Sequence, residues 1–162
     1  FPMFVDMNGR GVLVAGAGAV ASRKAAVLLR CGAWLRVASP AIGEGFDSVQ
    51  GLERVEFTNR DYSASDMTAP IGGSASVSMA IAATDSREVN HQVWLDAVKL
   101  GLPVNVADEP LECTFYFPSF VECDGFVAGV SSSGRSPAQC RRLADRLRSC
   151  WREWVTDVTS RD

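Results

Sequence analysis

The chain has 162 residues, of which 47% are hydrophobic and 22% charged, and its formal net charge is −3. This length suits one well-buried core and is short for two full domains, and the composition excludes disordered and fibrous classes. No apolar run approaches the roughly 20 residues of a membrane helix, so we expect no membrane partner. We also expect no nucleic-acid partner.

Strand and helix signals alternate through the first two thirds of the chain, as a doubly wound parallel sheet requires. We expect strands over residues 10–15, 34–38, 55–57, 77–83 and 103–107, and helices over residues 19–31 and 86–100. Gly101 is expected to end the second helix. The pattern predicts an α/β, Rossmann-like domain over residues 1–112 and a smaller region over 113–162.

The first expected strand leads directly into the run G-A-G-A-V-A over residues 16–21. Gly16 permits a tight turn, Gly18 lets the backbone approach a pyrophosphate, and Ala21 lets a helix pack closely on the strand. A helix N-terminus binds an anion without needing a lysine. The run predicts dinucleotide binding, although small-residue turns also serve ordinary strand-to-helix packing.

Polar or loop-forming residues follow the other expected strands. They are Ser39 and Pro40, then Thr84 and Asp85, then Asn105 and Asp108. Ligands of open α/β sheets bind beyond the carboxyl ends of the strands, so we expect a single active-site rim. An acid about 20 residues past the glycine turn usually binds the ribose 2′-hydroxyl. Here that place holds Ala38-Ser39-Pro40, so the spacing does not choose between NAD and NADP.

Two carboxylates have competing interpretations. Asp108 is a candidate general base, because partial burial at a strand end would make it a better proton acceptor, or else it caps the following loop. For Asp85 we favour the N-cap of the helix that begins near Ser86 over a direct ligand role. His91 is the only histidine, and we expect no metal site.

From residue 113 onward the pattern changes. Strands over 114–120 and 126–131, joined by a turn that ends in Asp-Gly, predict a β-hairpin. Ser136 is a good N-cap with Pro137 at the first helical position, so a helix should run from there toward Trp154. Little chain is left to cover its apolar stripe of Leu143, Leu147, Cys150 or Trp151, and Trp154, so we expect that stripe to pack on another subunit.

Charge and cysteine content add two further expectations. Residues 134–162 carry seven arginines against four acids, which indicates either a solvated helix face or a surface for an anionic ligand. The five cysteines are an odd number without C-x-x-C spacing. That count argues against a disulfide framework or a zinc ribbon and fits a cytoplasmic location.

Several blocks occur together in one order. They are FPMFVD at 1–6, the glycine turn, AATD at 82–85, NVAD at 105–108, FPS at 117–119 and SSSGRSP at 131–137. With these blocks the chain, from Phe1 to about Leu147, resembles the precorrin-2 dehydrogenase / sirohydrochlorin ferrochelatase family, the N-terminal module of siroheme synthase and its stand-alone relatives. The resemblance implies NAD-dependent oxidation of precorrin-2 to sirohydrochlorin by a homodimer, with ferrous iron insertion in several members.

The resemblance also implies roles for particular residues. The family's catalytic aspartate falls on Asp108, and its nucleotide contacts fall on Ala19, Val20, Pro40 and Ala41. A serine near the tetrapyrrole falls on Ser132. Because precorrin-2 carries many carboxylates, we expect substrate contacts from Ser132, Gly134, Arg135, Ser136 and Arg141. The alternative function is a regulatory Rossmann domain that senses NAD without catalysis.

Overall fold

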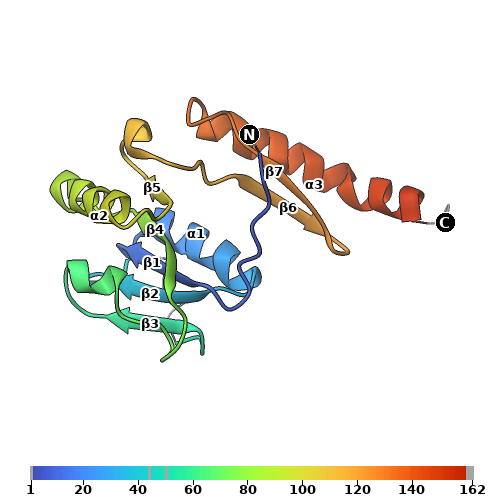
Figure 1. Ribbon diagram of the computed structural model, residues 1–162. Coiled ribbons are helices and arrows are strands. Elements are labelled where there is room, and N and C mark those ends of the chain that lie inside the picture. Colours follow the sequence, from blue (N-terminus) through green and yellow to red (C-terminus); the bar gives the residue numbers. More distant parts are fainter. Residues whose placement is uncertain (1, 44, 50, 160–162) are drawn as a thin grey trace. The chain divides into compact units, whose positions relative to one another are not determined.

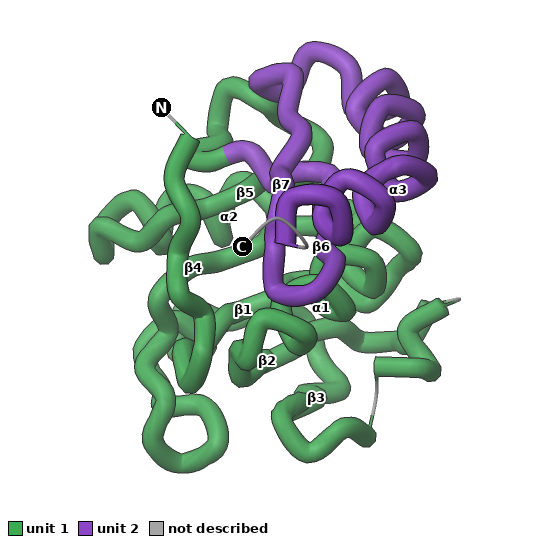
Figure 2. Tube along the Cα trace, turned by 90° about the vertical axis from the view of Figure 1, so that its right-hand side faces the viewer, with its two compact units in different colours: residues 1–115 green, residues 116–162 purple. Residues whose placement is uncertain are grey.

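The computed structural model describes residues 2–43, 45–49 and 51–159, so Phe1, the start of the first sequence block, lies outside the described residues. The chain forms two compact units, Phe1–Phe115 and Tyr116–Asp162 (Figure 2). The division expected after residue 112 falls inside the first unit, which we call unit 1; the other is unit 2. No helix in the described part of the chain is long and apolar enough to cross a membrane.

Unit 1 is built on a parallel sheet of five strands in the order β3-β2-β1-β4-β5 (Figure 1). The strands are β1 (Gly11–Ala15), β2 (Trp34–Ala38), β3 (Val55–Thr58), β4 (Val77–Ala82) and β5 (Val104–Val106), and the helices are α1 (Ala19–Arg30) and α2 (Arg87–Lys99). Every residue of β1 is buried, which is why the strand is a continuous apolar run. The α/β doubly wound class is confirmed.

The core of unit 1 follows from the alternation of side chains along the strands. Leu13 and Ala15 of β1 share one buried cluster with Val93 and Ala97 of α2. The intervening residues Val12 and Val14 are fully buried and point to the opposite face of the sheet. Helices on both faces leave the carboxyl ends of the strands as the edge on which loops gather.

Element boundaries agree with the sequence to within one or two residues at most ends. Gly101 does end α2: its φ is +70°, its N–H donates to Val98 O over 3.0 Å, and Leu102 N donates to Ala97 O over 2.9 Å. This is the bonding pattern of a glycine-terminated helix. Two short 3₁₀ helices, η1 (Ala64–Met67) and η2 (Pro110–Glu112), were not expected.

A buried arginine in β2 was also not expected from an apolar strand pattern. Arg36 is 8% exposed, and its guanidinium donates to the carbonyl oxygens of Ala69 and Pro70 over 2.9 and 2.7 Å. It also pairs with Glu56 over 2.8 Å, and that glutamate accepts from Gly72 N. These bonds hold residues 69–72 beside β2 and β3.

Unit 2 contains an antiparallel hairpin and one long helix. The strands β6 (Ser119–Cys123) and β7 (Phe126–Val130) pair with each other and pack on α3 (Pro137–Thr159). Asp124 and Gly125 have φ of 49° and 82°, the values of a tight two-residue hairpin turn. Of the strand expected over 114–120, only residues 119 and 120 belong to β6. Thr114 N instead donates to Val104 O over 2.9 Å, so Thr114 belongs to unit 1.

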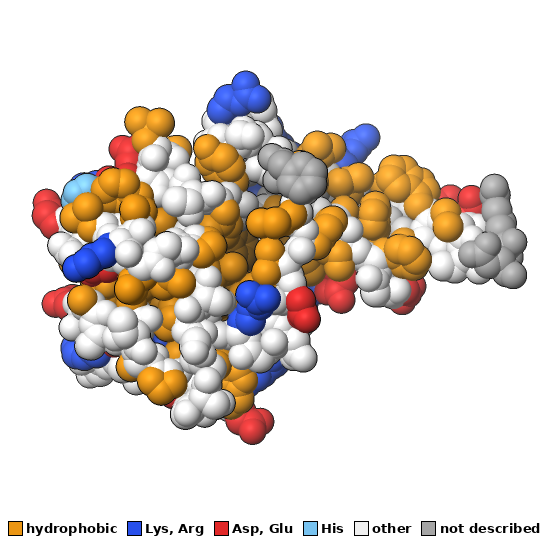
Figure 3. Space-filling view, in the orientation of Figure 1, with side chains coloured by type: hydrophobic (Ala, Val, Ile, Leu, Met, Phe, Trp, Pro, Cys, Tyr) orange, Lys and Arg blue, Asp and Glu red, His pale blue; other side chains and the backbone are white. Residues whose placement is uncertain are grey.

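The apolar stripe expected on α3 is not its buried face. Cys140, Ala144 and Val155, which lie outside that stripe, are buried. Leu143 and Trp154 of the stripe are 54% and 52% exposed, and Leu147, Cys150 and Trp151 are half-buried. Figure 3 shows hydrophobic side chains gathered along unit 2. The helix also continues five residues past Trp154, to Thr159.

Candidate functional site

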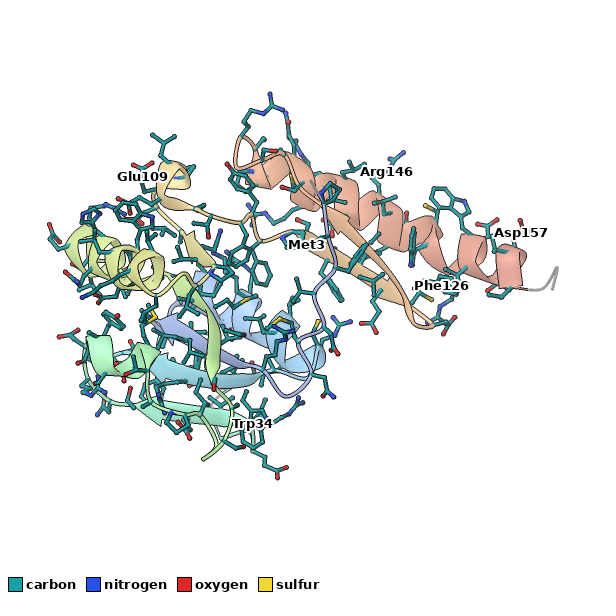
Figure 4. All side chains as sticks on the ribbon, in the orientation of Figure 1. Met3, Trp34, Glu109, Phe126, Arg146 and Asp157 are labelled. Atoms are coloured by element: carbon teal, nitrogen blue, oxygen red, sulfur yellow. The ribbon has the colours of Figure 1, made fainter. Side chains whose placement is uncertain are left out.

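A cleft of about 350 Å³ lies at the carboxyl ends of the strands of unit 1. Its walls are residues 16–18 after β1, 38–43 around the end of β2, Asp61 and Tyr62 after β3, and 83–86 and Val89 after β4. The expected convergence of strand ends therefore exists for four strands. Trp34, labelled in Figure 4, marks the opposite, amino end of β2.

The two glycines of the first loop meet different requirements. Gly16 has φ of +100°, and a Cβ there would lie 2.3 Å from Ala83 O, so the fold itself demands glycine. A Cβ on Gly18 would meet no described atom within 4 Å. Gly18 is the N-cap of α1, with no side-chain cap and no acid in the first turn among the described residues. Open space beside bare helical N–H groups fits a diphosphate.

The neighbouring positions Ala19 and Val20 are the first two residues of α1. Both are exposed beside Gly18, and neither lines the cleft. Ser39, Pro40 and Ala41 do line it. Ser39 is 7% exposed and its hydroxyl donates to Ala41 O over 2.7 Å, so this loop is closed by its own bond.

The loop after β4 is held by a buried amide that sequence reasoning missed. Asn90 of α2 is fully buried. Its Oδ1 accepts from Thr84 N over 3.0 Å, and its Nδ2 donates to Thr84 O over 3.1 Å. The signal was present in the sequence, because Asn90 lies three and seven residues before the buried Val93 and Ala97, on the apolar face of α2.

Asp85 is not the N-cap that we expected. Ser86 occupies that position, and its hydroxyl accepts from Val89 N over 3.3 Å. Asp85 is exposed and lines the cleft next to Thr84. Asp85 therefore lies beside the space where the resemblance implies a cofactor.

Asn105 lies in a polar network away from the cleft. The side chain is 6% exposed, its Oδ1 accepts from Lys24 Nζ over 2.5 Å, and its Nδ2 donates to Phe115 O over 3.0 Å. Burial lowers the pKa of Lys24 to about 8. Asn105 thus joins α1 to β5 and to the end of unit 1.

Asp108 lies past β5 and does not line the cleft either. The side chain is 38% exposed and so only partly buried, and Oδ1 accepts from Arg87 Nη1 over 3.1 Å. Arg87 also pairs with Glu112. Glu109, labelled in Figure 4, takes the capping role considered for Asp108, because its carboxylate accepts from Leu111 N over 3.1 Å.

Glu112 extends this charged group to the only histidine. Its Oε1 lies 2.7 Å from His91 Nδ1, and the His91 ring stacks on Trp94 with 5.2 Å between centroids. Burial opposes ionisation of Glu112, but hydrogen bonds from Arg87 and His91 hold its pKa below the ordinary value. Among the residues that the structure describes, no group of three or more histidine, cysteine, aspartate or glutamate side chains could hold a metal ion.

The expected substrate residues belong to unit 2, in the loop between β7 and α3 and on α3 itself. Ser132 Oγ accepts from Ser136 N over 2.7 Å, and Arg135 N donates to Ser132 O over 3.2 Å. Gly134 has φ of 79° within this loop. Arg135 and Arg141 are exposed and carry the positive charge near the start of α3.

Comparisons with known proteins agree with this geometry. Residues 3–119 match the model of a family described as "Putative NAD(P)-binding". A siroheme synthase of Psychrobacter arcticus is 38% identical over 147 residues, 91% of this chain and 26% of that protein. One from Photorhabdus laumondii is 34% identical over 146 residues, 90% of this chain and 30% of that protein.

A solved structure named "SirC, precorrin-2 dehydrogenase" superposes with a TM-score of 0.76. The superposition covers 99% of this chain and 75% of that chain, at 23% sequence identity. It shows that the two proteins share a fold. The chain spans less than a third of the length of the two siroheme synthases that it matches.

Proposed function

We propose, because this chain belongs to the NAD(P)-binding family whose model matches residues 3–119, that it is an NAD-dependent precorrin-2 dehydrogenase of siroheme biosynthesis. The strongest support is the open space at Gly18, where a Cβ would meet no described atom although the fold does not require glycine there. A backbone that leaves room beside a helix N-terminus suits a bound diphosphate. The names of the siroheme synthases and of the SirC structure supply the substrate class.

The cleft residues and the adjoining start of α1 would hold the dinucleotide in three sections. Gly16, Gly18 and the start of α1, with Ala19 and Val20, would bind the diphosphate. The loop of residues 39–41 would contact the adenosine half, and the loop with Thr84 and Asp85 the nicotinamide half. When bound, the nicotinamide ring accepts a hydride from the substrate.

Asp108 would accept the proton that precorrin-2 releases on oxidation. Its carboxylate is exposed and therefore reachable, and the ion pair with Arg87 involves Oδ1, which orients the group without occupying Oδ2 in that bond. A positioned carboxylate base contributes typically 10²- to 10⁴-fold to rate. We propose Arg87 as a positioning residue for this base.

Unit 2 would supply the groups that recognise the tetrapyrrole. The Ser132–Ser136 bond and the φ of Gly134 shape the loop that leads into α3. Arg135 and Arg141 are exposed and can bind the substrate's acetate and propionate carboxylates. The exposed Leu143 and Trp154 on α3 support a homodimer. None of the five cysteines, all of which lie among the described residues, forms a disulfide, which supports a cytoplasmic location.

Incubation of the purified chain with precorrin-2 and NAD⁺ tests the proposal. The expected result is a rise in sirohydrochlorin absorbance with one NADH formed per turnover. Binding of NAD⁺ without turnover would instead support the regulatory sensor and overturn the dehydrogenase. Iron insertion, which the resemblance implies for several family members, is tested separately with sirohydrochlorin and Fe²⁺ as substrates.

A further inference from the structure

The cleft has no carboxylate at the place where dinucleotide folds usually carry one. An acid at the end of the second strand normally accepts hydrogen bonds from the adenosine ribose. Here β2 ends at Ala38, and Ser39 and Pro40 follow. The Ser39 hydroxyl donates a hydrogen bond to Ala41 O over 2.7 Å, so this donor is already used inside its own loop.

The strand next to β2 brings a carboxylate to the same side of the cleft. β3 pairs in parallel with β2, and Thr58 lies opposite Ala38 at the carboxyl ends of both strands. Three residues later, Asp61 lines the cleft together with the loop of residues 39–43. Asp61 is exposed, so its charge faces solvent and any bound ligand.

Both neighbours of Asp61 are anchored in the protein. Arg60 donates two hydrogen bonds to the buried carboxylate of Asp66, over 2.8 and 2.7 Å, and a third to Asp61 O over 2.8 Å. Tyr62 OH donates to Asp96 Oδ2 over 2.8 Å. None of these bonds uses the Asp61 carboxylate, which the anchors hold at the cleft.

The hydrogen bonds of Arg60 also argue against the alternative that this segment binds the 2′-phosphate of NADP. An arginine near the ribose can bind the 2′-phosphate of NADP, and Arg60 adjoins Asp61 in the chain. Its guanidinium, however, is committed to Asp66 in a two-point bond, the geometry in which arginine and carboxylate bind most strongly. The group that this segment offers to the cleft is therefore the acid and not the base.

We propose that Asp61 is the residue that selects NAD over NADP, by accepting hydrogen bonds from the adenosine ribose hydroxyls and repelling a 2′-phosphate. An ionised carboxylate only accepts hydrogen bonds, so it pairs with hydroxyl donors and not with another anion. The inference rests on the proposed dinucleotide site. It adds a selecting acid that comes from the strand beyond the usual one.

Calorimetric titration of NAD⁺, NADP⁺, ADP-ribose and its 2′-phosphate into the full chain tests this assignment without any turnover. The wild type should bind NAD⁺ at least about tenfold tighter than NADP⁺, as expected for one charge-assisted hydrogen bond. In Asp61→Asn the dissociation constant of NADP⁺ divided by that of NAD⁺ should fall by about tenfold. The same ratio for the 2′-phosphate of ADP-ribose and ADP-ribose itself should fall by the same factor. Asp61→Ser should behave in the same way.

Two control variants separate this residue from charge in general. Asp47→Asn removes an exposed acid that does not line the cleft, and Glu44→Gln removes the acid that follows the loop after β2 in the sequence. Both should keep the wild-type ratio. An unchanged ratio in Asp61→Asn, or a ratio that falls in Glu44→Gln instead, overturns the assignment while the cofactor site stands. Failure of the wild type to bind any of the four ligands overturns the assignment and the proposed function together.

Discussion

Arg87 of α2 and Asp108, which follows β5, form an ion pair of 3.1 Å, although 21 residues separate them in the chain. Arg87 holds Glu112 at the same time, so one guanidinium connects the end of β5 to η2. The carboxylate that we propose as a base is therefore oriented by a helix and not only by its own loop. Orientation of a reacting group by a second residue can change rate strongly without changing chemistry.

We expect Asp108→Asn to lower the rate of precorrin-2 oxidation by at least about 100-fold, because the proton acceptor is lost. The dissociation constant for NAD⁺ should stay within about twofold, since Asp108 does not line the cleft. Arg87→Met should lower the rate by roughly tenfold through loss of orientation. Stopped-flow absorbance and calorimetry measure the two quantities, and a full rate in Asp108→Asn would exclude it as the base.

Substitution of the two glycines should separate folding from binding. In Gly16→Ala the alanine would have to adopt φ of +100°, and its Cβ would clash with Ala83 O. The substitution should therefore lower the free energy of unfolding by roughly 2 kcal/mol. Gly18→Ala should leave that free energy within about 1 kcal/mol but weaken NAD⁺ binding by about tenfold or more. Urea unfolding and calorimetry of both variants give the comparison. Equal NAD⁺ affinity in Gly18→Ala and the wild type would contradict a diphosphate at this place.

Asn90→Ala should destabilise unit 1 by about 3 kcal/mol, because it removes the partners of both the N–H and the carbonyl of Thr84. The loop that carries Asp85 should then be less well positioned, and NAD⁺ should bind more weakly. Gln92→Ala, an exposed change on the same helix, should stay within about 0.5 kcal/mol. Chemical denaturation of the two variants would refute the assignment of Asn90 if their stabilities matched.

The stability of the chain should rise with pH across the range in which Lys24 loses its proton. Burial lowers its pKa from 10.5 to about 8 in the folded state. Between these values the unfolded chain binds a proton that the folded chain has released, so raising the pH favours the folded state. Below about pH 8 both states are protonated and the dependence disappears.

Subtraction of the Lys24→Met variant isolates this dependence from the thiols and from Tyr62, whose pKa is raised by burial and by Asp96. The difference in unfolding free energy, wild type minus variant, should increase from pH 8 to pH 10. Urea titrations at half-unit steps provide it. Parallel curves for the two proteins would show that the folded lysine titrates normally.

Trp154→Glu should dissociate the proposed homodimer, because it puts a charge on the exposed apolar side of α3. Thr156→Glu adds the same charge two residues further on, where the helix faces another direction, and should leave the dimer intact. Sedimentation equilibrium should show twice the 17.4 kDa chain mass for the wild type and the control. A single-chain mass for the wild type would exclude the dimer.

Local pattern was sufficient for most of the fold. β2 begins and ends where the strand expected over residues 34–38 does, and Gly101 ends α2 in the expected way, because strand pattern and glycine conformation are local properties. The family resemblance is likewise confirmed, because residues 3–119 match an NAD(P)-binding family and two siroheme synthases are 34% and 38% identical over most of the chain. The strand expected over 114–120 begins only at Ser119, because Thr114 bonds to Val104, a partner that local pattern does not reveal.

The amino-acid sequence by itself determined the parallel α/β fold, the glycine turn and the family, since each follows from short blocks of neighbouring residues and their order along the chain. Tertiary structure alone decided that Asp61 lines the cleft, that Asn90 forms hydrogen bonds with Thr84, and that Asp108 pairs with Arg87. The Asp61 position requires β3 to lie beside β2, and the Asp108 pair requires α2 to lie beside β5. Strand order and helix placement, which hydrophobic period does not encode, set these relationships.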